Sequence, residues 1–338
     1  MKEISGSDTI GVKKFYTETN RFDARKFEDE LTLKFIEDGE VKLKKAFHHR
    51  KCPLCGSKLS NSTYQFKKNG FKHWMCIDCG GIYTNPSIDS YTIENEVYGE
   101  TLYPFLDSVN SSAQVKFDTL RFKQALDRLV SLGCKTHGNV MDFGCGSGLF
   151  LNICREYGFE VLMGNDLLRR AIDLSRSVYG LDETRYINGY EDISRVDSNT
   201  KLVALWEFLD HINEPQIFLD KLIQRMEVGT FIIISVRNSM SLAARIMRDK
   251  CNMFLGHAHF NFWSIETLRI ISDQFNLEIL DSYQYISERD AVKNFLNYQS
   301  IYNSVSQELS WLPSEDQIFE HNLGYKHVAI LQKIEHGG

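Results

Sequence analysis

Residues 140–151, Val-Met-Asp-Phe-Gly-Cys-Gly-Ser-Gly-Leu-Phe-Leu, constrain this 338-residue chain more than any other stretch. A short apolar strand over residues 139–143 runs into three glycines at alternate positions, and an apolar helix pattern follows through Ile153. Glycines let the backbone turn sharply and approach a ligand closely. The helix that opens after them presents free N–H groups and the positive end of its dipole. The stretch therefore predicts a strand, a ligand-binding loop and a helix.

The next predicted strand, residues 158–166, ends in an acidic residue about 20 positions after the loop, where a carboxylate can bind two ribose hydroxyls. The loop reads Asp-x-Gly-x-Gly-x-Gly, so this part of the sequence resembles the class I S-adenosylmethionine-dependent methyltransferases. A chance glycine turn is rejected because the pattern extends over both strands and both helices. In that family the loop after the third strand lies along adenine, and Tyr190 stands there in place of the usual acidic residue. The resemblance implies a cofactor site formed by Asp142, Gly144, Cys145, Gly146, Gly148, Asp166, Leu167, Tyr190, Trp206 and Glu207.

From residue 139 onwards, predicted strands and helices alternate, which favours a mostly parallel sheet covered by helices on both faces. The fold class is therefore α/β, a Rossmann-like methyltransferase sheet with a small zinc ribbon before it. Further strands are predicted at residues 185–187, 202–206, 231–236, 277–283 and 327–331, and helices at 113–132, 170–178, 215–226, 239–247 and from 265 after the N-cap Ser264.

Two cysteine pairs precede this domain, Cys52-x-x-Cys55 and Cys76-x-x-Cys79. Two such knuckles bring four thiolates around one tetrahedral Zn²⁺ at roughly 2.3 Å. Between them, two short alternating stretches meet at Asn69-Gly70, a strong hairpin turn. With all four ligand positions filled, the predicted zinc is structural, because a catalytic zinc needs an open position.

The predicted domain organisation is an N-terminal arm over residues 1–46, a zinc ribbon over 47–90 and a methyltransferase domain over 91–338. The arm has a helix pattern over residues 24–35 and no assigned chemistry, and it is expected to pack on the catalytic domain or on a second subunit. Residues 287–324 are too long for a turn and are expected to form helices over the active-site mouth. In the Tyr-rich stretch before residue 113, Tyr98 and Tyr103 are candidates to cover the cofactor.

Composition and charge exclude several classes. No apolar run reaches the roughly 20 residues that span a bilayer, and the first residues have no signal-peptide core, which predicts a cytoplasmic protein without a membrane partner. The net charge is −6. Between Lys42 and Lys72 nine Lys or Arg occur without an acidic residue, so the remainder carries −15. This balance disfavours nucleic acid as a partner but allows a local anion site.

Histidine is the expected general base because its pKa lies near the working pH. Residues 207–211, Glu-Phe-Leu-Asp-His, resemble the Glu-x-Leu-Glu-His stretch of small-molecule methyltransferases, which makes His211 the first candidate. His257 and His259 are expected on one side of an extended segment, in a His-x-His pattern similar to that of sugar methyltransferases. Each of the three histidines also has a purely structural interpretation, and Glu207 and Asp210 remain alternative bases.

The order of cysteine ribbon, class I domain and histidine-rich loop resembles zinc-binding methyltransferases of sugar and polysaccharide pathways. That resemblance implies transfer of methyl from S-adenosylmethionine to an anionic small molecule, a nucleotide-activated sugar or related precursor, with the basic ribbon placed to bind its pyrophosphate. The chain lacks the large third domain of the sugar C-methyltransferases, so O-methylation is favoured over C- or N-methylation. The alternatives are an RNA methyltransferase that docks RNA on the ribbon, and a non-catalytic cofactor-binding scaffold. A homodimer is left open.

Overall fold

The computed structural model describes residues 11–49, 51–98 and 103–335. Its largest sheet has seven strands and is parallel except for β15, which runs antiparallel to both of its neighbours. The apolar run predicted at 231–236 forms β12, buried along its whole length as expected for a strand covered on both faces. The strand order is β10 (Thr184–Tyr186), β9 (Val161–Asp166), β8 (Asn139–Phe143), β11 (Thr200–Trp206), β12 (Phe231–Arg237), β15 (Lys326–Lys333) and β14 (Leu277–Tyr285).

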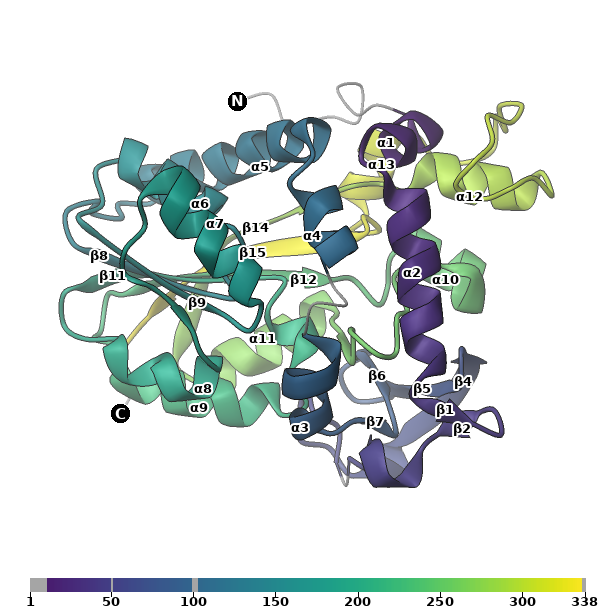
Figure 1. Ribbon diagram of the computed structural model, residues 1–338, viewed down its shortest axis with the longest axis horizontal. Helices are drawn as coiled ribbons and strands as arrows, with labels where there is room; N and C mark the ends of the chain where they lie inside the picture. Colours follow the sequence, from purple (N-terminus) through teal and green to yellow (C-terminus); the bar gives the residue numbers. More distant parts are fainter. Residues whose placement is uncertain (1–10, 50, 99–102, 336–338) are drawn as a thin grey trace.

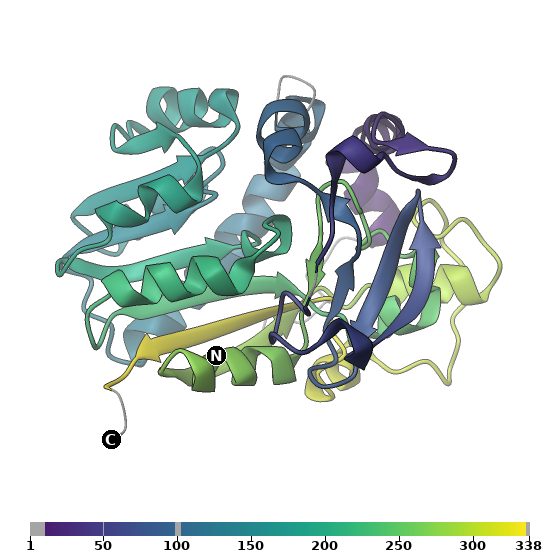
Figure 2. The same cartoon turned by 90° about the horizontal axis from the view of Figure 1, so that it is seen from below.

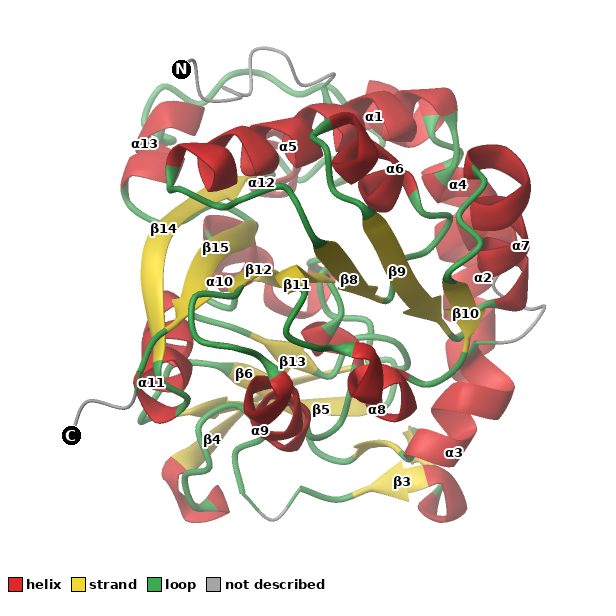
Figure 3. Cartoon of the chain, turned by 90° about the vertical axis from the view of Figure 1, so that its left-hand side faces the viewer, coloured by secondary structure: helices red, strands yellow, loops and turns green. Residues whose placement is uncertain are grey.

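Helices cover both faces of this sheet, which confirms the predicted Rossmann-like class (Figure 3). On one face α5 (Ser112–Ser131), α6 (Leu149–Glu156) and α7 (Arg169–Tyr179) enclose a core with the inward side chains of β8 and β9. On the other face α9 (Pro215–Arg225) and α11 (Ile265–Gln274) enclose a second core, and the short α8 (Gly189–Asp192) follows β10. Pro215 occupies the first turn of α9, where its missing N–H costs no hydrogen bond.

The cysteine region forms a second, four-stranded sheet beside the large one (Figures 1 and 2). The predicted hairpin is present: β4 (Ser62–Lys68) and β5 (Phe71–Cys76) turn at Asn69 and Gly70, both with positive φ. Next to β5 lies β6 (Ile82–Thr84), and the fourth strand is β13 (Asn261–Phe262), which comes from the part of the chain that follows β12. The ribbon sheet is thus completed by residues far along the sequence.

The ribbon also shares a core with the large sheet. Cys52, Cys76 and Cys79 pack in the same apolar cluster as Leu268 and Ile271 of α11. The N-cap predicted at Ser264 forms a capping box with Thr267, and both hydroxyls donate to the carbonyl of Cys79, at 2.5 and 3.2 Å. The same cap therefore supplies hydrogen-bond partners to the first turn of α11 and holds the Cys76–Cys79 knuckle against that helix.

The N-terminal arm packs on the domain of the same chain that contains the large sheet. Its helices are α1 (Val12–Glu18) and α2 (Arg21–Leu33); the latter begins three residues before the predicted start and packs along α4 (Tyr103–Val109) (Figure 1). Tyr16 of α1 stacks on Tyr302, with ring centroids 5.0 Å apart. Tyr302 belongs to the segment of residues 287–324, called the insert below. The insert contains α12 (Arg289–Leu296) and α13 (Glu315–Glu320). The side chain of Tyr103, predicted to cover the cofactor, lies outside the described residues.

The remaining strands and α-helices are short. They are β1 (Ile36–Glu37), β2 (Glu40–Val41), β3 (Ala46–Phe47), β7 (Ser87–Ile88), α3 (Ser90–Thr92) and α10 (Leu242–Met247). In the part of the chain that the structure describes, no helix combines the length and the apolar character needed to cross a bilayer.

Candidate active site

A cavity of about 1860 Å³ lies at the carboxyl ends of β8, β9 and β11. Ligands of open parallel sheets bind at this edge. Nine of the ten residues predicted for the cofactor line the cavity, and Gly148 does not. Those that do are Asp142, Gly144, Cys145, Gly146, Asp166, Leu167, Tyr190, Trp206 and Glu207.

The three loop glycines all have positive φ, at +73, +52 and +84°, but they face different surroundings. A Cβ on Gly148 would overlap a methyl carbon of Leu181, and one on Gly144 would lie 3.1 Å from the ring of Phe208. A Cβ on Gly146 would meet nothing within 4 Å. Gly144 and Gly148 therefore permit close packing, whereas Gly146 leaves space open beside the cavity.

Two carboxylates flank this loop. Asp166 accepts hydrogen bonds from the backbone N–H of Gly146 at 3.0 Å and of Leu168 at 2.7 Å, one on each oxygen, which leaves further lone pairs for ribose hydroxyls. Asp142 is 2% exposed and its Oδ1 has no partner among the described residues. Burial, then the nearby Asp166, raises the pKa of Asp142 well above its ordinary value. An unpartnered acceptor beside the open space over Gly146 fits a polar, hydrogen-bonding cofactor.

Tyr190 occupies the wall where adenine contact was expected. Its hydroxyl donates to the carbonyl of Glu214 at 2.9 Å and its ring lies edge-on to Phe218 at 5.2 Å. Asp192 in the same turn is buried, accepts from Asn165 at 3.1 Å and does not line the cavity. Glu191 does line it, and this acidic neighbour of Tyr190 was not among the predicted residues.

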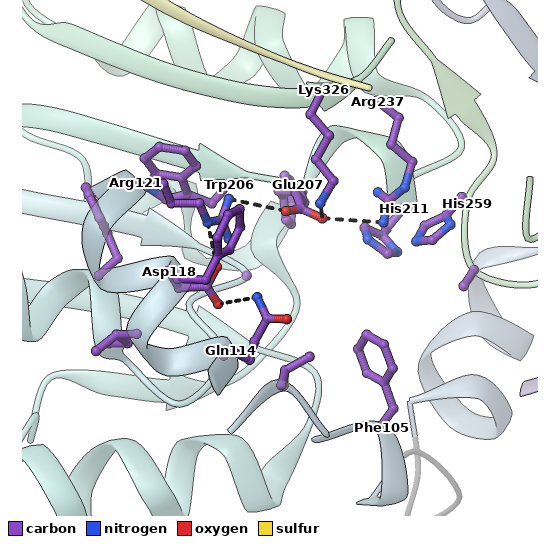
Figure 4. A pocket seen from close by; sticks show the side chains of 18 of the residues that line it. Phe105, Gln114, Asp118, Arg121, Trp206, Glu207, His211, Arg237, His259 and Lys326 are labelled. Carbon is purple, nitrogen blue, oxygen red and sulfur yellow. Dashed lines mark hydrogen bonds and ion pairs between the residues drawn. The ribbon is translucent and has the colours of Figure 1, made fainter. Parts of the chain in front are cut away.

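Glu207, directly after β11, is the centre of an ion-pair cluster (Figure 4). Its φ is +56°, and its N–H donates to the carbonyl of Ser235 at 2.8 Å. Its carboxylate contacts Arg121 at 3.3 Å, Arg237 at 3.4 Å and Lys326 at 2.5 Å. Burial alone would raise the pKa of Glu207, but the three cations hold it well below the ordinary range. Such a carboxylate stays charged and is a poor general base, so it serves better as an anchor.

Sequence reasoning missed the three cations of this cluster. Lys326 begins β15, and because β15 is antiparallel its start lies at the edge where β12 ends. Arg237 is the last residue of β12. Arg121 lies on the buried face of α5, one turn before Ala125, and also pairs with Asp118 at 2.6 Å. A charged residue on an apolar helix face was a signal available in the sequence.

His211 lies in the turn after β11 and lines the cavity. Its Nδ1 is 3.0 Å from the hydroxyl of Tyr98. Burial, then Arg237, lowers the pKa of His211 to about 3. Its neighbour Asp210 is fully buried and pairs with Arg237 at 2.6 Å. Burial raises the pKa of Asp210 to about 6 against the opposing effect of Arg237, and Asp210 does not line the cavity.

His259 also lines the cavity, beside His211, with ring centroids 4.7 Å apart (Figure 4). Its Nδ1 is 3.2 Å from the carbonyl oxygen of Met253. A carbonyl can only accept, so Nδ1 carries the proton and Nε2 is the basic nitrogen. Burial, then Arg237, keeps the pKa of His259 well below its ordinary value, so the ring is neutral at neutral pH.

The structure does not bring His257 to this cavity. The expectation of an extended segment with both histidines on one side is wrong, because residues 256–258 form a turn in which Ala258 and His259 donate to the carbonyl of Leu255. His257 is 1% exposed, and its Nδ1 is 2.6 Å from the hydroxyl of Thr32 in α2. His257 thus links the arm to the histidine loop.

The four predicted zinc ligands form a four-cysteine cluster away from this cavity. The sulfur atoms of Cys52, Cys55, Cys76 and Cys79 all lie within 4.8 Å of one another, with Cys52–Cys79 at 3.9 Å and Cys55–Cys76 at 3.6 Å. Tetrahedral zinc with Zn–S bonds of about 2.3 Å needs sulfur–sulfur distances of about 3.8 Å. A glycine with positive φ follows each pair and closes the knuckle. The donor set and spacing fit a closed structural zinc site.

Comparisons with known proteins agree with this geometry. Residues 116–282, just under half of the chain, match the sequence model of a family described as a methyltransferase domain. A curated relative, the mitochondrial ubiquinone biosynthesis O-methyltransferase of Schizosaccharomyces pombe, is 25% identical over 119 residues, which cover 34% of this chain and 43% of the relative. The chain thus matches less than half the length of that protein.

Solved structures include similar chains. A SAM-dependent methyltransferase from Archaeoglobus fulgidus is 20% identical, with a TM-score of 0.48, over 68% of this chain and all of that chain. Magnesium protoporphyrin IX methyltransferase from Synechocystis, with bound SAH, is 13% identical, with a TM-score of 0.42, over 64% of this chain and 83% of that one. The family match, the sheet order and the glycine loop at the carboxyl edge show that the chain carries a class I S-adenosylmethionine-dependent methyltransferase domain.

Proposed function

We propose that this chain transfers a methyl group from S-adenosylmethionine to a hydroxyl oxygen of an anionic small molecule, an activated sugar or related precursor. The observation that carries the proposal is the pair of neutral histidines that face the same cavity as the glycine loop and Asp166. A neutral imidazole there can take up the hydroxyl proton as the oxygen attacks carbon, although burial and Arg237 make both histidines weaker bases than a free histidine. The name of the curated relative, an O-methyltransferase, also supports oxygen as the acceptor atom.

In this proposal Gly146, Asp142 and Asp166 hold the cofactor, which would supply an electrophilic methyl group. When bound, the cofactor would give up this methyl group from its sulfur to the acceptor oxygen, and a histidine would take up the hydroxyl proton. His259 is the better base, because its Nδ1 is fixed by Met253 and its Nε2 accepts no hydrogen bond from the described residues. His211, paired with Tyr98, positions the acceptor. Methyl transfer otherwise depends on alignment of the two reactants.

The anionic group of the acceptor is not expected on the ribbon. No described residue between positions 29 and 89 lines the cavity. Several cations of the basic segment are engaged within the chain: Lys67 and Lys72 pair with Glu40, and Lys68 donates to the carbonyl of Cys251 at 2.7 Å. These contacts weaken the case for RNA docking on the ribbon, as does the −15 carried outside it.

We also propose that the four-cysteine cluster binds one structural Zn²⁺. The sulfur spacing and the closed ligand set support it. A bound metal would fix the knuckle whose Cys79 carbonyl is held by α11.

The test is transfer of labelled methyl from S-adenosylmethionine into two separate pools, nucleotide-linked sugars with related metabolites and total RNA. Label is expected in the small-molecule pool, and product fragmentation should place it on oxygen. His259→Gln should reduce kcat by about 100-fold or more with little change in KM, since base catalysis contributes about 10²–10⁴. Label confined to RNA would overturn the acceptor class, and wild-type kcat in His259→Gln would remove it as the base.

A further inference from the structure

Two arginines of the N-terminal arm lie in the wall of the cavity. Arg21 and Arg25 are one turn apart on α2, and both line the same space as the glycine loop. The guanidinium of Arg21 lies between the rings of Phe15 and Phe105, with its central carbon 5.8 and 5.9 Å from their centroids. In both arginines Nε is buried and has no hydrogen-bond partner in the described part of the chain. Arg21 Nη1 and Arg25 Nη2 make no hydrogen bond to the described residues either and are not among the buried atoms, so the arm contributes donors that this part of the chain leaves unused.

Only one of these two arginines contacts a carboxylate group of the described residues. Arg25 pairs with Glu28 at 2.9 Å, whereas Arg21 has no carboxylate within ion-pair distance in the described residues and is held by the neutral amide of Gln114 at 2.8 Å. Burial, then repulsion from Arg25, lowers the pKa of Arg21. A half-buried guanidinium without a contacting counter-charge is only partly hydrated, which favours binding of an anion.

Glu288 faces this pair from the insert but does not neutralise it by contact. Its φ is +52°, its Oε2 is buried, and that oxygen has no hydrogen-bond partner in the described chain. Burial raises the pKa of Glu288 to about 7, against the opposing effects of Arg25, Lys326 and Arg21. Near neutral pH its carboxyl is partly protonated, so it can also donate to an anion.

A continuous hydrogen-bond path joins Arg21 to the centre of the site, and Figure 4 shows its part from Gln114 to Glu207. Arg21 donates to Gln114, and Gln114 donates to Asp118 at 3.0 Å. Asp118 pairs with Arg121 at 2.6 Å, and Arg121 contacts Glu207 at 3.3 Å. Because Gln114, Asp118 and Arg121 all lie on α5, Arg21 keeps a fixed position relative to the end of β11.

We propose that Arg21 and Arg25 form the subsite for the anionic group, a phosphate or a carboxylate, of the molecule that is methylated. The inference rests on the proposed function for the identity of the ligand as acceptor, but not for the binding of anions. Guanidinium groups match both anions because their planar fork presents parallel N–H donors. The arm is then the part of the chain that selects the acceptor by its charge.

The experiment is calorimetric titration of the full chain at constant ionic strength and pH 6.5, with S-adenosylhomocysteine present. Inorganic pyrophosphate and malonate are the probes, so that the two sources of negative charge are compared directly. Arg21→Gln should weaken binding of the better probe at least tenfold, because a charge-assisted hydrogen bond contributes about 1.5–3 kcal/mol. Arg21→Lys should recover part of the loss. Arg245→Gln, which changes an arginine outside the cavity, should bind as the native chain does.

Equal affinity in Arg21→Gln and the native chain would overturn the subsite, as would an equal loss in Arg245→Gln. A melting temperature and a near-ultraviolet spectrum like those of the native chain show that Arg21→Gln is folded. Binding of S-adenosylmethionine, titrated separately, tests the cofactor site. Loss of anion binding with intact cofactor binding supports the subsite even if no methyl transfer is found, so the two proposals fail independently.

Discussion

At the residue scale, the open space beside the cofactor loop depends on a glycine, which has no side chain to fill it. Gly146 and Gly180 both have positive φ, +52 and +62°, and a Cβ on either would meet nothing within 4 Å. Only Gly146 lines the cavity. The two positions therefore carry the same backbone strain and differ in what a side chain would occupy.

Gly146→Leu is expected to raise the dissociation constant for S-adenosylmethionine at least 100-fold, because the side chain enters the space over the loop. Gly180→Leu carries the same cost of about 1 kcal/mol or more for a left-handed conformation, and should bind the cofactor normally. Calorimetry of both variants checks this. Unchanged affinity in Gly146→Leu would refute the assignment of the loop.

His73 gives the protein a pH-dependent stability. It is fully buried, stacked on Phe66 at 4.8 Å, and neither ring nitrogen has a partner in the described residues. Burial, then Lys68, lowers the pKa of His73 to about 3. The unfolded chain takes up a proton below about pH 6.5 and the folded chain does not, so the stability is complete above that pH and falls as the pH drops towards about 3.

His73→Phe should therefore lose less stability on acidification than the native chain. For this one group the expected difference between pH 7.5 and pH 5 is about 2 kcal/mol. Urea unfolding of both chains at the two pH values measures it. Parallel loss in the two chains would show that His73 is protonated in the folded state.

At the scale of elements, the cysteine knuckles connect two sheets through α11. Cys76→Ser is expected to abolish stoichiometric zinc and to lower the melting temperature. The Cys76–Cys79 knuckle, whose Cys79 carbonyl accepts a hydrogen bond from the N-cap of α11, would lose its metal. Cys134→Ser, at a buried cysteine outside the cluster, should keep one zinc per chain. Metal analysis measures the zinc content of each variant, and thiol titration counts its free cysteines. A zinc-free native protein whose four cluster cysteines all titrate as free thiols would contradict the site.

Local patterns predicted the helices and strands well. The strand at 139–143 has the predicted bounds, and the N-cap at Ser264 and the Asn69-Gly70 turn are where their chemistry placed them. Each of these depends on residues a few positions apart. Of the cofactor site, nine residues reach the cavity because one motif fixes the sheet edge that all of them share.

What the sequence did not reveal depends on distant pairings. β13 is two residues long and exists because β6 pairs with it, so no periodicity marks it. His257 turns away from the cavity because the turn at Leu255 alters the alternation. Arg21 lies on an ordinary polar helix, and its place in the site follows only from how α2 packs on α4.

At the scale of the whole molecule, the ribbon is connected through β13 to the turn that borders the cavity. Phe260 donates to the carbonyl of Asp210 at 2.8 Å, and Asn261 donates to the carbonyls of Leu209 and Ile212. The strand that completes the ribbon sheet therefore also holds the turn that carries His211, and it follows closely after His259. The glycine loop lies on other elements.

Removal of zinc by a chelator is thus expected to lower kcat more strongly than it weakens binding of S-adenosylmethionine. Turnover and calorimetry on chelated and zinc-restored protein test this, with recovery of kcat after zinc addition as the control. Equal losses of both quantities would indicate global unfolding instead.

Because β13 lies far after the ribbon in the sequence, the ribbon sheet can be completed only late in synthesis. The ribbon residues leave the ribosome first, but the open edge of β6 cannot be paired until Asn261 and Phe262 emerge. At translation rates of about 5–20 residues per second, a delay of roughly 180 residues lasts about 10–40 s. For that time the nascent chain exposes an apolar strand edge that a chaperone would recognise, and a chain truncated before residue 261 would never cover it.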